Sequence, residues 1–71
     1  MNRVQYPPSF VYDNIDGLFA ERIKRGVSLH DIRIATGLAS STILAYEKGK
    51  GNPSRKTYNK LAELFNWRQW E

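Results

Sequence analysis

The feature that most constrains this chain is Gly37, which separates two short segments with helical periodicity. The first segment opens at Ser28, whose hydroxyl can accept a hydrogen bond from the free N–H groups of a helix's first turn, with Asp31 three residues later. Gly37 follows where the chain must adopt a conformation that most L-residues resist. The sequence therefore predicts a short helix over about residues 29–36 that stops at this glycine.

A second helix is predicted directly after the turn, over about residues 40–48. Ile43 and Tyr46 lie three residues apart and so share one side of it. Two short helices joined this tightly cross at a steep angle, as in a helix-turn-helix, and the outer face of the second helix stays free. That outer face carries Ser40, Ser41, Leu44, Ala45 and Lys48.

Residues of particular types stand at fixed spacing around this turn. They are Gly26, Val27, Ser28, Thr36, Gly37, Leu38, Ile43, Tyr46, Glu47, Gly49, Lys50, Asn52, Pro53 and Ser54. With these residues in register, the chain resembles the DNA-binding domain of the Cro/phage-repressor (XRE-like) transcriptional regulators. The resemblance covers roughly residues 14–67.

The resemblance implies an all-α fold, a compact four- to five-helix bundle of the lambda-repressor-like helix-turn-helix type. We expect residues 14–71 to form this domain, because a chain of 71 residues has room for one. Residues 1–13 contain Pro7-Pro8, which cannot lie inside a helix, and are expected to form an extended N-terminal arm. The arm has three possible roles: packing on the domain's own surface, pairing with a second subunit, or reaching into a minor groove with Arg3.

Apolar stripes predict the two remaining helices. Asp13 can cap the first, which Gly26 can end, and its expected core face consists of Ile15, Leu18, Phe19 and Ile23. Ser54 can cap the last, which Asn66 can end, and its expected core face consists of Tyr58, Leu61, Ala62 and Phe65.

Two tryptophans, Trp67 and Trp70, follow the last predicted helix on a short tail. Large aromatic side chains either bury themselves against a core or mark a contact with another protein when they stay exposed. We therefore interpret the pair as a hydrophobic lid on the bundle or, if exposed, as part of a dimer contact.

Positive charge is concentrated in one part of the chain. Eleven Lys and Arg against seven Asp and Glu give a net charge of +4, yet Lys48 to Lys60 contains five basic residues and no acidic one. This block runs from the second helix of the motif through a loop into the last helix. Its position favours binding to a polyanion over the alternative, a charged face that contacts only solvent. The residues expected to contact DNA phosphates are Arg22, Ser28, His30, Lys48, Lys50, Gly51, Asn52, Arg55 and Lys56.

The helix at residues 40–48 is expected to enter the DNA major groove and to read bases. Its candidate reading residues are Ser40, Ser41, Thr42, Leu44 and Ala45. Hydroxyls bond to several bases and discriminate weakly, whereas Leu44 and Ala45 can contact a thymine methyl. Ala39 stands where the family usually has a capping Ser or Thr, so we expect Ser40 to cap this helix instead.

Arg22 and Glu47 match an Arg and a Glu that pair across the bundle in similar repressor domains. By resemblance we expect a partly buried ion pair. Its main role is expected to be structural, tying the reading helix to the scaffold, with a phosphate contact from Arg22 as a secondary role.

The resemblance implies a sequence-specific DNA-binding transcriptional regulator, expected to be a repressor, whose partner is double-stranded DNA. A homodimer is expected because one small module with a hydroxyl-rich reading helix has little affinity alone. The alternative is the same fold used as a protein-interaction module, antitoxin- or antirepressor-like, with weak or no DNA binding. The apolar surface at Leu44 and Ala45 and an exposed tryptophan tail would favour that alternative.

Other functional classes find little support in the sequence. There is no cysteine, and His30 is the single histidine, so neither a disulfide framework nor a metal site is expected. No nucleophile–base pair or carboxylate dyad suggests an enzyme, and no cofactor or small-molecule ligand is expected. The chain also lacks a long apolar run and a secretory signal, so we expect a cytoplasmic protein without membrane contact.

Overall fold

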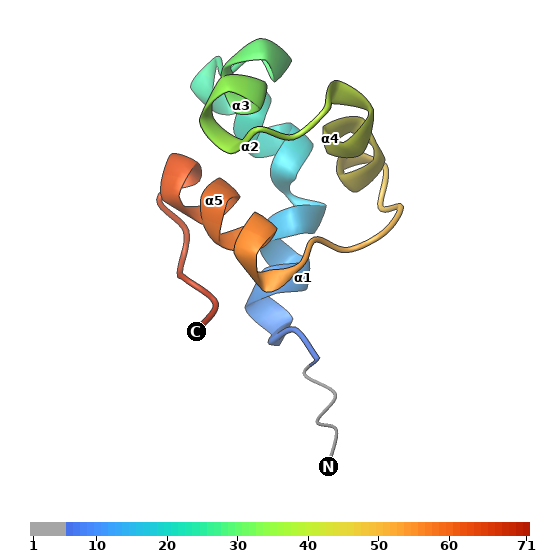
Figure 1. The fold of residues 1–71 in the computed structure, drawn as a ribbon, viewed down its shortest axis with the longest axis vertical. Coiled ribbons are helices and arrows are strands. Elements are labelled where there is room, and N and C mark those ends of the chain that lie inside the picture. Colours follow the sequence, from blue (N-terminus) through green and yellow to red (C-terminus); the bar gives the residue numbers. More distant parts are fainter. Residues whose placement is uncertain (1–5) are drawn as a thin grey trace.

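A computed structural model describes residues 6–71, which form five helices and no strand. In Figure 1 the first helix lies behind the last one, the second lies behind the third at the upper end of the molecule, and the fourth lies on the right. The third helix packs on the fourth and fifth, and the fourth also packs on the first two. The expected all-α bundle is thereby confirmed. Its elements are α1 (Ser9–Asp16), α2 (Leu18–Arg25), α3 (Leu29–Thr36), α4 (Ser40–Glu47) and α5 (Arg55–Phe65).

The first helix begins at Ser9, so the expectation of an extended arm over residues 9–13 was wrong. Pro8 takes the extended position just before the helix, where the fixed φ of proline is tolerated. Val11 is buried, which extends the apolar stripe of Ile15 by one helical turn. Residues 1–5 of the predicted arm, Arg3 among them, lie outside the described residues.

Asp13 does not cap a helix, contrary to expectation, because it lies inside α1. Backbone hydrogen bonds of the helical type continue from α1 across Gly17 into α2. The Gly17 N–H donates to the Asp13 carbonyl (3.1 Å), and the Gly17 carbonyl accepts from the Glu21 N–H (2.9 Å). No side chain caps α2, whose start depends on this continuity instead.

Two residues predicted for the core, Phe19 and Ile23, are instead exposed, with relative solvent accessibilities of 53% and 57%. The inward direction of these helices is set by Ile15 and Leu18, which are both buried. Four residues beyond Leu18, the inward position is occupied by Arg22, which finds a charged partner on α4. Phe19 and Ile23 each stand one position further round the helix and therefore face outward.

The last helix supplies much of the core, as predicted. Ser54 caps it by accepting the Thr57 N–H on its Oγ (3.3 Å), and Asn66 ends it with a left-handed φ of 61°. Its buried side chains meet Ile32 of α3 and Ile43 of α4 in one cluster. The buried residues of α5 are the four expected ones, Tyr58, Leu61, Ala62 and Phe65.

The tail after α5 folds back over the bundle and confirms the hydrophobic lid. The Trp67 ring stacks on Phe65 at a centroid distance of 5.0 Å, and Trp70 is buried. Both backbone groups of Trp70 bond to the side-chain amide of Asn59: its N–H donates to Oδ1 (2.7 Å) and its carbonyl accepts from Nδ2 (2.8 Å). These contacts hold the tail in an extended path without a further helix.

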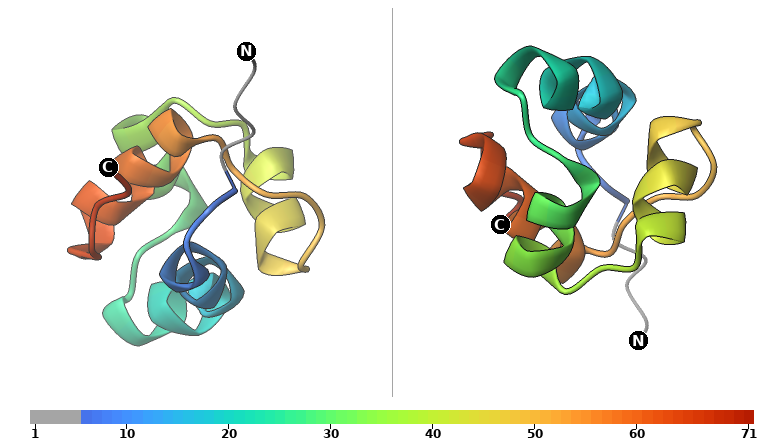
Figure 2. Two further views of the ribbon diagram at one scale, coloured as in Figure 1. Left: turned by 90° about the horizontal axis from the view of Figure 1, so that it is seen from below. Right: turned by 90° about the horizontal axis from the view of Figure 1, so that it is seen from above.

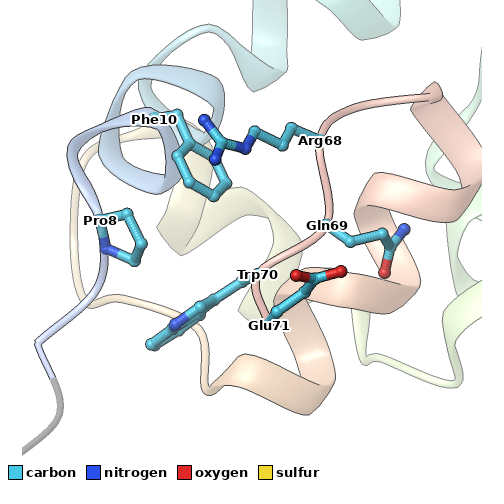
Figure 3. Close-up of a pocket in the computed structure, with 6 residues that line it drawn as sticks. All are labelled: Pro8, Phe10, Arg68, Gln69, Trp70 and Glu71. Carbon is cyan, nitrogen blue, oxygen red and sulfur yellow. The ribbon is translucent and has the colours of Figure 1, made fainter.

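The tail also joins the first helix to α5. The Asn14 amide donates to the Tyr58 hydroxyl (2.9 Å), which donates in turn to the Arg68 carbonyl (2.7 Å). The Arg68 guanidinium lies over the Phe10 ring, and a surface pocket of about 410 Å³ remains beside them (Figure 3). All residues that line this pocket come from the start of α1 and from the tail, so it is separate from α4.

Candidate nucleic-acid interface

A reciprocal pair of bonds fixes the start of α3, as the sequence predicts. The Asp31 N–H donates to the Ser28 Oγ (3.0 Å), and the Ser28 N–H donates to the Asp31 Oδ2 (3.2 Å). The backbone N–H and then the hydroxyl of Ser28 lower the pKa of the Asp31 carboxyl, and neighbouring His30 adds to this effect. The Ser28 hydroxyl thus has a structural task, while His30 is exposed in the first turn.

The turn between α3 and α4 is fastened from both sides. Gly37 has a φ of 74°, which confirms the predicted left-handed stop. The buried Thr36 hydroxyl donates to the Ile32 carbonyl (2.7 Å) and accepts from the Leu38 N–H (3.2 Å). These bonds define how α4 leaves the turn, and the helices expected at residues 29–36 and 40–48 are present as α3 and α4.

Helix α4 begins without a side-chain cap. Ala39 occupies the N-cap position in an extended conformation, and Ser40 is the first helical residue. The expected capping role of Ser40 was therefore wrong, because its backbone already belongs to the helix. Capping does not occupy the Ser40 hydroxyl.

One long side of α4 is left uncovered by the rest of the bundle. Ile43 is fully buried and defines the inner side. Figure 2 shows α4 at one edge of the molecule, with no other helix over its far side. The candidate reading residues lie there or on its flanks: Ser41 and Leu44 are exposed, and Ser40, Thr42 and Ala45 are half-buried.

The predicted ion pair between Arg22 and Glu47 is present and fastens α4 to α2. Two nitrogens of Arg22, Nε at 3.1 Å and Nη2 at 2.9 Å, donate to the same Glu47 oxygen, Oε1. The side chains are only 13% and 4% exposed. The Arg22 guanidinium also lies over the Phe19 ring, 5.5 Å from its centroid.

The end of α4 turns the basic loop back against the helix. Gly49 adopts a left-handed φ of 75° and donates its N–H to the Tyr46 carbonyl (3.0 Å). The Lys50 N–H reaches back to the Ala45 carbonyl (2.8 Å), which completes a helix-ending motif that needs glycine at this place. Lys48 and Lys50 are thereby both exposed at the end of the candidate reading helix.

The loop from α4 continues into the start of α5 with its basic side chains in solvent. Pro53 is buried and anchors the loop, and the hydroxyl of Ser54 caps α5. The positive end of the α5 dipole therefore adds to the charge of its first residues. Five of the expected phosphate-binding residues in this segment are exposed: Lys50, Gly51, Asn52, Arg55 and Lys56.

Sequence reasoning missed three polar residues outside the candidate interface that connect other parts of the fold. Asn14, Asn59 and Arg68 tie α1, α5 and the tail together, and none was singled out. Asn59 carried one usable signal, because asparagine is a poor helix former and here stands inside a helix next to core residue Tyr58.

Two further observations concern other kinds of site. Within residues 6–71, no three His, Cys, Asp or Glu side chains come together as metal ligands. In the same part of the chain, no helix combines the length and the apolar character needed to cross a bilayer.

Comparison with known proteins agrees with this architecture. A family model described as helix-turn-helix matches residues 18–68, from the start of α2 into the tail, while α1 lies before the match. Searches of curated proteins and of solved structures find no significant match. The family match covers well over half of the chain. The chain therefore belongs to the helix-turn-helix family of the Cro/phage-repressor (XRE-like) type and is a DNA-binding regulator.

Proposed function

We propose that this protein is a sequence-specific transcriptional repressor that inserts α4 into the major groove of its operator as a homodimer. The observation that carries the proposal is the uncovered side of α4 directly beside a basic segment. Lys48, Lys50, Arg55 and Lys56 are all exposed there, and no acidic residue lies between positions 48 and 60. Repression then follows from occupancy, because the bound protein blocks polymerase.

The proposed base-reading residues are those on the free side and flanks of α4: Ser40, Ser41, Thr42, Leu44 and Ala45. Apart from Leu44 these side chains are small, so α4 can approach the base edges closely. Hydroxyl groups bond to several bases, and the discrimination they provide is weak. We therefore assign part of the specificity to DNA shape and to the spacing of the two half-sites.

The proposed phosphate contacts come mainly from Lys48, Lys50 and the start of α5. Arg22, Ser28 and His30 complete the set from the other side of α4. Arg22 already donates two hydrogen bonds to Glu47, and Ser28 already caps α3, so their phosphate contacts are secondary. Backbone N–H groups of Gly51 and Asn52 supply directional donors that need no side chain.

A dimer is proposed because one small reading face supplies little affinity. A two-fold pair would place two copies of α4 in successive major grooves about 34 Å apart. The alternative, a protein-interaction module without DNA binding, loses one support because Trp70 is buried and Trp67 is stacked. A cytoplasmic location, where such DNA is accessible, belongs to the same proposal.

The proposal is tested by selecting binding sites for the full chain from a random duplex pool. We expect an enriched inverted repeat whose half-site centres lie about 10 base pairs apart. Light scattering on the free protein and on the complex then gives the number of subunits. A pool without enrichment, together with near-zero affinity for any duplex at low salt, would favour the interaction module instead.

A further inference from the structure

The free side of α4 has an unusual chemical make-up for a surface that reads bases. From Ser40 to Glu47 the helix contains no amide, guanidinium or ammonium side chain. Glu47 is buried in its ion pair, so it does not take part. The paired donors and acceptors that identify guanine or adenine by two hydrogen bonds are therefore missing from this helix.

The apolar group on this side is Leu44, whose relative solvent accessibility is 37%. Its inner neighbour Ile43 is fully buried, which turns Leu44 outward onto the flank of α4. Ala45 beside it is small and half-buried, and exposed Ser41 lies one turn earlier. Because these neighbours of Leu44 are small, the helix can come close to the floor of the major groove.

The surroundings of Leu44 indicate which partner covers it. Lys48 and Lys50 are exposed at the end of the same helix, and Arg55 and Lys56 follow on α5. Positive charge at one end of a small apolar face complements a polyanion better than an apolar protein surface. At the base edges of the major groove, the C5-methyl group of thymine is the apolar feature that an exposed aliphatic side chain can contact.

We infer that Leu44 and Ala45 recognise the C5-methyl group of pyrimidines, which deepens the proposed function and rests on the insertion of α4 into the groove. 5-Methylcytosine carries this methyl at the same place as thymine. Leu44 has no polar atom that would distinguish the neighbouring amino group of cytosine from the carbonyl of thymine. Methylation of cytosine in the operator is therefore expected to strengthen binding, not to leave the affinity unchanged.

The test uses the full chain and the site enriched from the random pool. At each pyrimidine of one half-site, affinity is compared for thymine against uracil and for 5-methylcytosine against cytosine. The partner base stays the same within each comparison, so only the methyl group changes. At one or more positions we expect loss of the methyl to weaken binding roughly fourfold in both comparisons, as for one apolar carbon removed from contact.

Two variants assign this effect to a residue. Leu44→Ala shortens the proposed reader and is expected to bring both affinity ratios close to one. Ile34→Ala is the matched control, because Ile34 is 75% exposed but lies on α3, outside the proposed contacts, and it should keep both ratios. Circular dichroism melts of the two variants check that both remain folded.

The outcomes separate the two proposals. If a site is enriched but both ratios equal one at every position, or if Leu44→Ala keeps them, methyl recognition is wrong while operator binding stands. If no site is enriched and no duplex binds at low salt, operator binding is wrong and methyl recognition falls with it.

Discussion

The two sides of this small bundle are built in opposite ways. On the side of α4 and the following loop, Ser41, Leu44 and the basic side chains are exposed. On the side of the tail, Tyr58 is fully buried and Trp70 nearly so. Residues that hold the fold together are thus largely separate from those proposed to contact DNA, and the two sets meet at the pair of Arg22 and Glu47.

The tail side shows how the segment after α5 is held against the bundle. Tyr58 lies within 6.4 Å, centroid to centroid, of the rings of Phe10, Trp67 and Trp70. Asn59 satisfies both backbone groups of Trp70, as a neighbouring strand would. These contacts fix the tail against α1 and α5.

The largest expected effect is on stability, at the point where the two sides meet. Glu47→Ala leaves the Arg22 charge partly buried without its partner and should lower the free energy of unfolding by about 3–5 kcal/mol. Urea denaturation measures it. Glu21→Ala, which removes the partner of the more exposed Arg25, is the matched control and should cost less than about 1 kcal/mol. A urea denaturation curve of Glu47→Ala equal to that of wild type would contradict this account of the ion pair between Arg22 and Glu47.

The second effect is on DNA affinity alone. Combining Lys50→Ala with Lys56→Ala removes two exposed charges, so we expect roughly tenfold weaker binding per contact at about 0.1 M salt. The salt slope should become shallower by about two, and the melting temperature should stay unchanged. Lys24→Ala, at an exposed position of α2, is the control. If Lys24→Ala weakens binding as much as Lys50→Ala or Lys56→Ala does alone, the basic block has no special role.

The third prediction is a loss of stability that leaves DNA affinity unchanged. Asn59→Ala leaves the N–H and the carbonyl of Trp70 without their partners and should lower the free energy of unfolding by about 1–3 kcal/mol. Well below the melting temperature, DNA affinity should match wild type. Gln69→Ala, at an exposed tail position, provides the control. A large loss of affinity in a fully folded Asn59→Ala protein would show that the two sides are not separate.

The smallest effect concerns the start of α3. Ser28→Ala removes a helix cap and should lower the free energy of unfolding by about 1 kcal/mol. Because folding lowers the pKa of Asp31, its contribution is present above the ordinary value of 3.8 and is lost as the pH falls below it. Urea melts from pH about 5 to about 3 should therefore show a smaller acid loss for Ser28→Ala than for wild type. Equal acid losses would contradict a contribution of the Ser28 hydroxyl to the lowered pKa of Asp31.

Local chemistry made the helix-turn-helix predictable. Ser28, Gly37, Ser54 and Asn66 each act on backbone groups a few residues away, and all four have the predicted roles. The start of α4 was predicted correctly, but its N-cap was assigned to Ser40, whereas Ala39 occupies that position. Only the packed structure shows which of them is already helical.

Tertiary packing decided the features that the sequence left open. Phe19 and Ile23 have helical spacing and looked like core residues. They face outward because Arg22 occupies the inward position and pairs with Glu47, which is distant in the chain. The bonds from Asn59 to Trp70 also join residues that no local pattern connects. The helices of the candidate interface were therefore predictable, whereas the tertiary contacts elsewhere in the bundle were not.

The most direct test of the central claim is a salt series with a fluorescent duplex of random sequence, followed by anisotropy. The exposed basic residues beside α4 predict tight binding at low salt, with log K falling linearly with log salt. The expected slope is about −0.9 for each of roughly four to six phosphate contacts per subunit. Absence of binding at low salt, or an affinity that does not change with salt, would contradict the claim that this chain binds DNA through the basic residues between Lys48 and Lys60.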